Sequence, residues 1–152
     1  YGTLAFMPEL RKQNESSVVN ISSIWGLLGS PYQSAYSTSK FGIRGFTEAL
    51  AAEELCNNTG VAVTSVHPGG VKTNIVRNIE GQNLTELQLK KLDTHFPTTA
   101  DKTADKIIYA IKKKKSRIVI GPDAKFMYRL SRFSQRITMK FLVNWAKKMM
   151  KI

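Results

Sequence analysis

Cysteine is nearly absent from this sequence of 152 residues, in which Cys56 is the only one. A single cysteine excludes an internal disulfide and a cysteine-based metal site, and it favours a reducing, cytoplasmic location. The two histidines, His67 and His95, have no partners at metal-ligand spacing, so we expect no metal. We expect Cys56 itself to be an inert, buried thiol on a helix.

Long apolar runs are missing as well. No stretch approaches the roughly 18 residues that a membrane-spanning helix requires, and no signal-peptide pattern is present. With 42% hydrophobic and 22% charged residues, the composition is that of a globular domain and excludes a disordered or collagen-like chain. Because the chain enters a pattern midway at Tyr1, we expect it to be a piece of a longer protein.

Acidic residues are scarce in the last third of the chain. Residues 1–100 contain 8 basic and 8 acidic side chains, whereas residues 101–152 contain 15 basic and 3 acidic ones. The formal net charge of +12 therefore belongs to the C-terminal region. The charge alone does not indicate a nucleic-acid-binding function for the chain as a whole.

Strand and helix patterns alternate along the chain. Short β-rich apolar runs predict buried strands, and stretches of good helix formers lie between them. The order strand, helix, strand, helix, strand indicates parallel strands with right-handed crossovers and an α/β layered fold. The predicted segments are a helix end at 1–12, strands at 18–21, 61–66 and 117–121, and helices at 34–57 and 101–114, the last capped by Thr99 or Asp101.

Polar residues follow the predicted strands, where ligands bind in parallel sheets. Ser23 follows the first strand and residues 68–70 follow the second, while Tyr36 and Lys40 lie one turn apart at the start of the long helix. An ammonium beside a phenol favours the phenolate, and a serine hydroxyl can hydrogen-bond a substrate oxygen together with the phenol. This set suits proton transfer to or from a carbonyl or alcohol oxygen. Alone, the Tyr-x-x-x-Lys spacing also arises by chance in surface pairs.

The residues around this pair strengthen the interpretation. The sequence reads VNISS at 19–23, places Tyr36 thirteen residues after the last of these serines and Lys40 four residues further on, and continues VHPGGVKT at 66–73. Together these features resemble the short-chain dehydrogenase/reductase family. The resemblance implies a Rossmann-like, doubly wound parallel sheet of which residues 1–123 would be the C-terminal half.

The resemblance also implies an NAD(P)-dependent oxidoreductase in which a hydride moves between the nicotinamide and a substrate carbon. Tyr36 would be the catalytic acid/base, Lys40 would favour its phenolate and hold the nicotinamide ribose, and Ser23 would position the substrate oxygen. NAD and NADP both stay open as the cofactor. Besides Tyr36 and Lys40, the cofactor would contact Pro68, Gly69, Val71 and Thr73.

Several motifs of the family are absent from this chain. It has no glycine-rich turn of the Thr-Gly-x-x-x-Gly-x-Gly kind, no Asn-Ala-Gly strand end and no helix asparagine to complete a proton relay. We therefore expect a fragment that binds a dinucleotide poorly and is inactive alone. The alternative is a non-catalytic relative with a membrane-surface or scaffolding role.

Apolar residues dominate two segments where the family places the walls of its substrate site. Residues 24–31 would form the facing wall and residues 73–98 the lid. We predict a small-molecule substrate with a large hydrophobic part, such as a lipid-derived, steroid-like or other bulky alcohol or ketone. The apolar residues concerned are Trp25, Leu27, Leu28, Ile75, Val76 and Ile79.

The segment 124–152 is predicted to be a basic amphipathic helix. Such a helix can lie on an anionic membrane surface, or it can pack on its own domain or on a partner subunit with its basic face in water. In the complete protein we expect a homo-oligomer and no nucleic-acid partner. The apolar face holds Phe126, Leu130, Phe133, Ile137 and Phe141, and the basic flank holds Arg129, Arg132, Arg136, Lys140 and Lys147.

Overall fold

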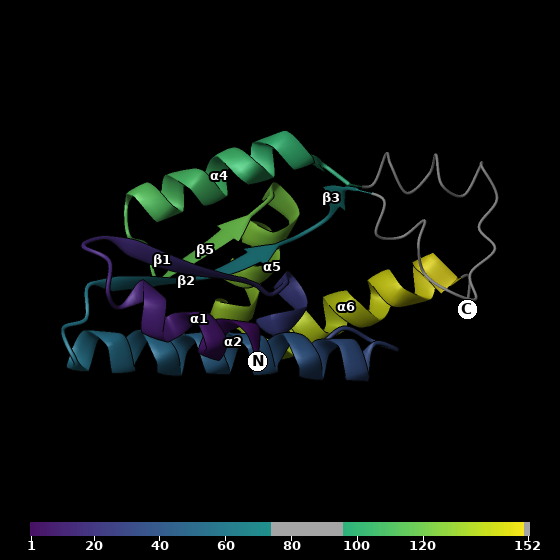
Figure 1. The fold of residues 1–152 in the computed structure, drawn as a ribbon. Coiled ribbons are helices and arrows are strands. Elements are labelled where there is room, and N and C mark those ends of the chain that lie inside the picture. Colours follow the sequence, from purple (N-terminus) through teal and green to yellow (C-terminus); the bar gives the residue numbers. More distant parts are fainter. Residues whose placement is uncertain (74–95, 151–152) are drawn as a thin grey trace.

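A parallel sheet lies at the centre of the computed structural model, which describes residues 1–73 and 96–150 (Figure 1). Helix α4 lies on one side of this sheet, and helices α1 and α2 lie on the other (Figure 1). The strands pair in the order β1-β2-β5, which confirms the predicted α/β, Rossmann-like fold. The elements are α1 (Gly2–Leu10), β1 (Ser16–Ile21), α2 (Ser34–Cys56), β2 (Val61–Pro68), α4 (Ala100–Lys112) and β5 (Arg117–Ile120).

The register of the sheet brings two chain segments together at its carboxyl edge. Strand β1 ends at Ile21, which lies opposite Val66 of β2. Strand β2 continues to Pro68, two residues beyond the predicted end, because β5 pairs with it there. Proline is tolerated at this terminal position although it cannot donate a ladder hydrogen bond. The residues after β1 therefore lie beside the last residues of β2.

A first hydrophobic core lies between the sheet and helices α1 and α2. Asn20 links the same three elements, because its amide donates to Thr47 Oγ1 of α2 over 3.0 Å and accepts from Thr3 of α1 over 3.4 Å. The helix end predicted at 1–12 is thus a packed helix that covers β1. The buried residues of this core are Met7, Val18, Leu50, Val61 and Val63.

The end of α2 corrects the prediction for Cys56. This thiol is exposed and not buried. The inward face of the helix passes through Leu50 and Glu54, four residues apart, so Cys56 points away from the domain. Glu54 is buried because Arg11 donates to both of its oxygens, and this contact holds the pKa of the carboxyl below its ordinary value.

The C-terminal segment contains two helices where the sequence predicts one. Helix α5 (Pro122–Phe133) and helix α6 (Gln135–Met150) are separated by Ser134, whose backbone is extended at φ −157° and ψ 116°. The Ser134 hydroxyl accepts a hydrogen bond from the Ile137 amide over 3.3 Å, as an N-cap serine does. Serine therefore ends one helix and begins the next.

Both C-terminal helices pack on their own domain. They share a second core with the short 3-10 helix η1 (Ile24–Gly26). One of the predicted substrate-wall residues, Leu28, is buried in this core, while Trp25 and Leu27 are half-buried against it. The buried residues of the second core are Ile24, Leu28, Ala124, Met127 and Leu142.

A two-stranded parallel sheet, absent from the predictions, forms beside the main one. Strand β3 (Val71–Lys72) pairs with β4 (Thr98–Thr99). Thr99 then caps α4 by accepting a hydrogen bond from the Lys102 amide, so it fills the role for which Asp101 was the other candidate. Most of the predicted lid, including Ile75, Val76 and Ile79, lies outside the described residues.

Candidate active site

Ser22 anchors the end of β1 to helix α2. Its amide donates to the Val66 carbonyl and its hydroxyl donates to the Lys40 carbonyl, each over 2.8 Å. Gly26 allows this close approach, because a Cβ atom there would lie 2.7 Å from the same Lys40 carbonyl oxygen. A residue that the sequence suggests is only part of a turn therefore fixes the distance between the two segments of the site.

Ser23 is 6% exposed and has an extended backbone at the start of η1. Its side-chain oxygen accepts a hydrogen bond from the Trp25 amide over 3.2 Å. Because a hydroxyl is both donor and acceptor, this bond leaves the Ser23 proton available for another oxygen.

Tyr36 and Lys40 lie together on the first turns of α2, as their spacing predicts. The Lys40 ammonium is 5.5 Å from the centroid of the Tyr36 ring and donates to the Ile21 carbonyl over 3.3 Å. The ammonium is therefore held between the end of β1 and the phenol. Tyr36 is 40% exposed, and within residues 1–73 and 96–150 its hydroxyl has no hydrogen bond, including to Ser23.

His67 contacts Ser23 and is completely buried. Its Nδ1 is 2.9 Å from the Ser23 carbonyl oxygen, and its Nε2 is 2.7 Å from Ser65 Oγ. Burial lowers the pKa of His67, an effect that the Ser23 carbonyl opposes and the charge of Arg117 reinforces. In the neutral ring Nδ1 donates to the carbonyl, which can only accept, and Nε2 accepts from Ser65.

Sequence reasoning gave His67 no metal-ligand partner and identified neither of these contacts. The alternation of Ser65 and His67 along β2 places both side chains on one face of the strand, and this signal could have predicted their contact. The hydrogen bond between His67 and Ser23 could not be predicted from the sequence, since the partner of the His67 ring is a main-chain carbonyl.

Asp123 holds the turn that follows β2. Its Oδ2 accepts a hydrogen bond from the Gly70 amide over 2.7 Å, while the Gly69 amide donates to the Ile120 carbonyl over 2.9 Å. A Cβ atom on Gly69 would lie 2.2 Å from the same carboxylate oxygen, so a larger residue there would displace the Asp123 carboxylate from the Gly70 amide. The sequence analysis did not identify Asp123, which comes from the first turn of α5.

The other predicted cofactor contacts lie next to this turn. Val71 pairs with Thr98, and Thr73 is two residues further along the chain. Two buried side-chain oxygens here, Thr98 Oγ1 and Asp123 Oδ1, have no hydrogen-bond partner within the described parts of the chain. Polar atoms next to the turn are thus available for a further hydrogen bond.

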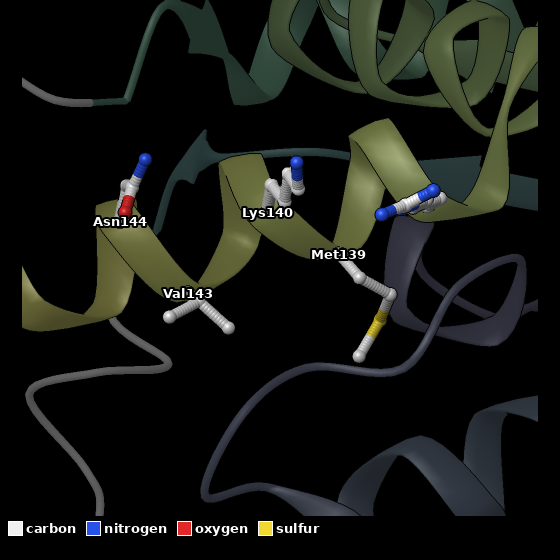
Figure 2. A pocket seen from close by; sticks show the side chains of 5 residues that line it. Met139, Lys140, Val143 and Asn144 are labelled. Atoms are coloured by element: carbon white, nitrogen blue, oxygen red, sulfur yellow. The ribbon is translucent and has the colours of Figure 1, made fainter.

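A hollow of about 420 Å³ lies on α6, away from these residues (Figure 2). None of the candidate catalytic residues contributes to its lining, so it is not the site at the strand ends. The described residues that line it are Arg136, Met139, Lys140, Val143 and Asn144.

The parallel sheet, with Ser23, Tyr36 and Lys40 near its carboxyl edge, has a Rossmann-like α/β architecture. Residues 1–84 match the family described as short chain dehydrogenase. This match covers more than half of the chain, which therefore belongs to the short-chain dehydrogenase/reductase family.

Curated relatives agree with this assignment. SadH of Mycobacterium tuberculosis, a protein named as an oxidoreductase, is 42% identical over 137 residues, which cover 86% of this chain and 49% of SadH. A 3-ketodihydrosphingosine reductase of Bacteroides thetaiotaomicron is 41% identical over 83 residues, covering 55% of this chain and 29% of the reductase. The chain thus spans about half the length of SadH and 29% of the length of the reductase.

Solved structures show the same fold. A short-chain dehydrogenase from Streptomyces avermitilis has a TM-score of 0.69 and 27% identity, with 96% of this chain and 57% of that chain covered. A short-chain dehydrogenase from Burkholderia cenocepacia in complex with NADP has a TM-score of 0.72 at 23% identity and covers 93% of this chain and 54% of its own. A Burkholderia phymatum relative in complex with NAD has a TM-score of 0.70 at 24% identity, with coverages of 90% and 54%.

Proposed function

We propose that this chain is the C-terminal half of an NAD(P)-dependent oxidoreductase that interconverts a hydrophobic alcohol and its carbonyl. The observation that carries the proposal is the Lys40 ammonium held 5.5 Å from the Tyr36 ring by the end of β1, next to the buried Ser23. Family membership supports it, as do the related structures that contain NAD or NADP.

Each of the three residues has a distinct task in the proposed reaction. In the oxidising direction the phenolate of Tyr36 takes the hydroxyl proton of the alcohol, and in the reducing direction the phenol returns it to the carbonyl oxygen. Lys40 places its positive charge beside the Tyr36 ring. The Ser23 hydroxyl donates a hydrogen bond to the same substrate oxygen and keeps its proton. When bound, the nicotinamide cofactor accepts or supplies the hydride.

The donors of Lys40 fit the ribose of such a cofactor. An ammonium has three donors, and one of them is directed to the Ile21 carbonyl. The other two would donate to a pair of neighbouring ribose hydroxyls. Pro68, Gly69, Val71 and Thr73 would line the nicotinamide and pyrophosphate from the turn that Asp123 holds. The choice between NAD and NADP depends on the residue that ends the second strand of the complete fold.

An open sheet edge supports the proposal that further strands belong beside β1. In the described part of the chain β1 pairs only with β2, and Ile21 at its end is 46% exposed. An unpaired edge is an aggregation liability that native proteins cover. The N-terminal half of the family fold would cover this edge and supply the glycine-rich turn.

The non-catalytic alternative is less well supported. A scaffolding relative has no need of an acid/base tyrosine, yet this chain retains Tyr36 together with Lys40 and Ser23. The homo-oligomer expected from the sequence stays a prediction.

We propose a hydrophobic substrate because two apolar side chains that follow Ser23 within four residues keep part of their surface exposed. Trp25 and Leu27 pack against the second core but are only half-buried, so their exposed parts would form the substrate wall, whereas Leu28 is buried in that core. One relative is, by its name, a reductase of 3-ketodihydrosphingosine.

Replacing Tyr36 by phenylalanine tests the mechanism in the complete protein. We expect Tyr36→Phe to lower kcat by roughly 10²- to 10⁴-fold, because it removes the group that transfers the proton. Cofactor affinity, measured by fluorescence titration with NADH and NADPH, should stay within about twofold of the native value because the Lys40 contacts remain. Retained turnover would refute the assigned role of Tyr36. The matched control Tyr32→Phe removes a hydroxyl four residues earlier, before the helix starts, and should leave kcat unchanged.

A panel of alcohols tests the substrate class separately. We expect long aliphatic and steroid alcohols to give a higher kcat/KM than short polar alcohols, because burial of each additional methylene contributes about 0.8 kcal/mol. A preference for the short polar alcohols would reject the hydrophobic substrate while leaving the role of Tyr36 intact.

A further inference from the structure

Helix α6 buries only part of its apolar surface. Thr138, Leu142 and Ala146, each four residues from the next, form the stripe that packs on the domain, and all are at least nine-tenths buried. The neighbouring stripe is also apolar but remains 41–46% exposed, although its side chains are just as large. This exposed stripe consists of Ile137, Phe141 and Trp145.

Helix α5 extends the exposed stripe. Phe126 packs the edge of its ring against Phe141 with their centroids 5.8 Å apart, and it is 53% exposed. Phe133 lies directly before the break at Ser134 and is 82% exposed. We call Phe126, Phe133, Ile137, Phe141 and Trp145 the apolar ridge. Large apolar side chains gathered in this way mark a binding surface.

Positive charge accompanies the apolar ridge. Residues 122–148 contain seven basic side chains and one acidic one, and the carboxylate of that residue, Asp123, binds the Gly70 amide. Figure 2 shows the border of the polar face on α6, with Lys140 and Asn144 on one side of the helix and Met139 and Val143 on the other. The exposed basic residues that flank the ridge are Arg129, Arg132, Arg136 and Lys140.

The combination of charge and apolar surface selects the partner. A second copy docked through the same face would bring two strongly positive surfaces together, which is unfavourable. A nucleic acid needs open aromatic faces for stacking, whereas Phe126 packs on Phe141 and Trp145 packs on Trp25 at 6.1 Å. An anionic bilayer satisfies both features, because its headgroups pair with the basic residues and its acyl chains receive the apolar ones.

We propose that the apolar ridge and its basic flank bind the surface of an anionic lipid bilayer. The helices lie in the plane of the interface, with Phe133 inserted deepest and the arginines at the level of the phosphates. In keeping with this orientation, the described part of the chain contains no helix that is long and apolar enough to cross a membrane. The proposal does not depend on the oxidoreductase activity.

Vesicle co-sedimentation of the complete protein tests this proposal. We expect the protein to bind phosphatidylcholine vesicles that contain phosphatidylserine. Its binding to vesicles of phosphatidylcholine alone should be weaker by roughly tenfold or more. Phe133→Ser should weaken the binding by about tenfold, because it removes the most exposed side chain of the apolar ridge. The double variant Arg132→Gln, Arg136→Gln should weaken it by about thirtyfold, since each basic residue contributes about fivefold near a charged surface.

Matched variants elsewhere on the chain serve as controls. Phe6→Ser changes a phenylalanine on α1 that is 68% exposed, and the pair Lys102→Gln, Lys106→Gln removes two exposed charges at the same spacing on α4. These variants should bind vesicles as the native protein does. The proposal is overturned if the ridge variants bind vesicles as well as the native protein or no worse than the control variants. It is also overturned if the ridge variants change the oligomeric state in the absence of lipid.

Discussion

The strand ends and the C-terminal helices use their side chains in opposite ways. At the ends of β1 and β2 the polar residues Ser22, Ser23 and His67 are buried and hydrogen-bonded within the domain. On α5 and α6 large apolar residues face water, and among the described residues none of the basic side chains of these helices forms an ion pair. In the functions proposed above, the first region fixes the geometry of a reaction, whereas the second contacts a lipid surface outside the domain.

Replacing His67 should have the largest effect on stability. His67→Asn removes the ring that joins Ser65 to the Ser23 carbonyl and leaves both partners buried, so we expect a loss of about 2–3 kcal/mol in the free energy of unfolding. Urea denaturation of the complete protein measures this value. A loss below about 0.5 kcal/mol, the range of ordinary surface substitutions, would show that the buried bonds do not stabilise the strand ends.

The same variant should alter the pH dependence of stability. Because burial lowers the pKa of His67, the unfolded chain takes up this proton first as the pH falls below about 6.5, and the native protein loses stability there. The asparagine variant lacks this proton uptake. The difference in unfolding free energy between the two proteins should therefore narrow from pH 7 to pH 5, and a constant difference would contradict a neutral, buried His67.

Replacing Phe133 should have the smallest effect on stability. We expect Phe133→Ser to change the free energy of unfolding by less than about 0.5 kcal/mol, because an exposed side chain adds little to the core. The same urea denaturation gives the value, and vesicle binding should fall in the same preparation. A loss above about 1 kcal/mol would mean that Phe133 is packed in the complete protein, and the contrast between the two regions would then fail.

Local patterns were sufficient to predict the elements of the main sheet and its helices, and the proximity of Tyr36 to Lys40. The apolar run at 18–21 and the helix formers at 34–57 correspond to β1 and α2, and the spacing of Tyr36 and Lys40 placed them on adjacent turns. These predictions succeeded because periodicity is a property of neighbouring residues.

The contacts that support the site could not be predicted in the same way. Ser22 bonds a main-chain oxygen 18 residues away, His67 one 44 residues away, and Asp123 an amide 53 residues away. Main-chain partners leave no trace in residue type, so only the folded structure shows them.

Two errors came from ambiguous local signals. Ser134 fits the polar side of one long amphipathic helix and also fits the N-cap of a second, and the packing on η1 decides for the second. Cys56 is apolar enough for a buried position, but the inward face of α2 is occupied by Glu54, whose charge the Arg11 guanidinium offsets.

The contact between Trp25 and Trp145 connects the two regions and can be observed directly. Trp25 follows Ser23 by two residues, Trp145 belongs to the apolar ridge, and they are the only tryptophans in this chain. Their rings, 6.1 Å apart, contribute tryptophan fluorescence from the contact between η1 and α6. The protein thus contains its own optical probe at the junction of its strand ends and its outward-facing helices, and an emission change when lipid is added would report that α6 and the segment after Ser23 respond together.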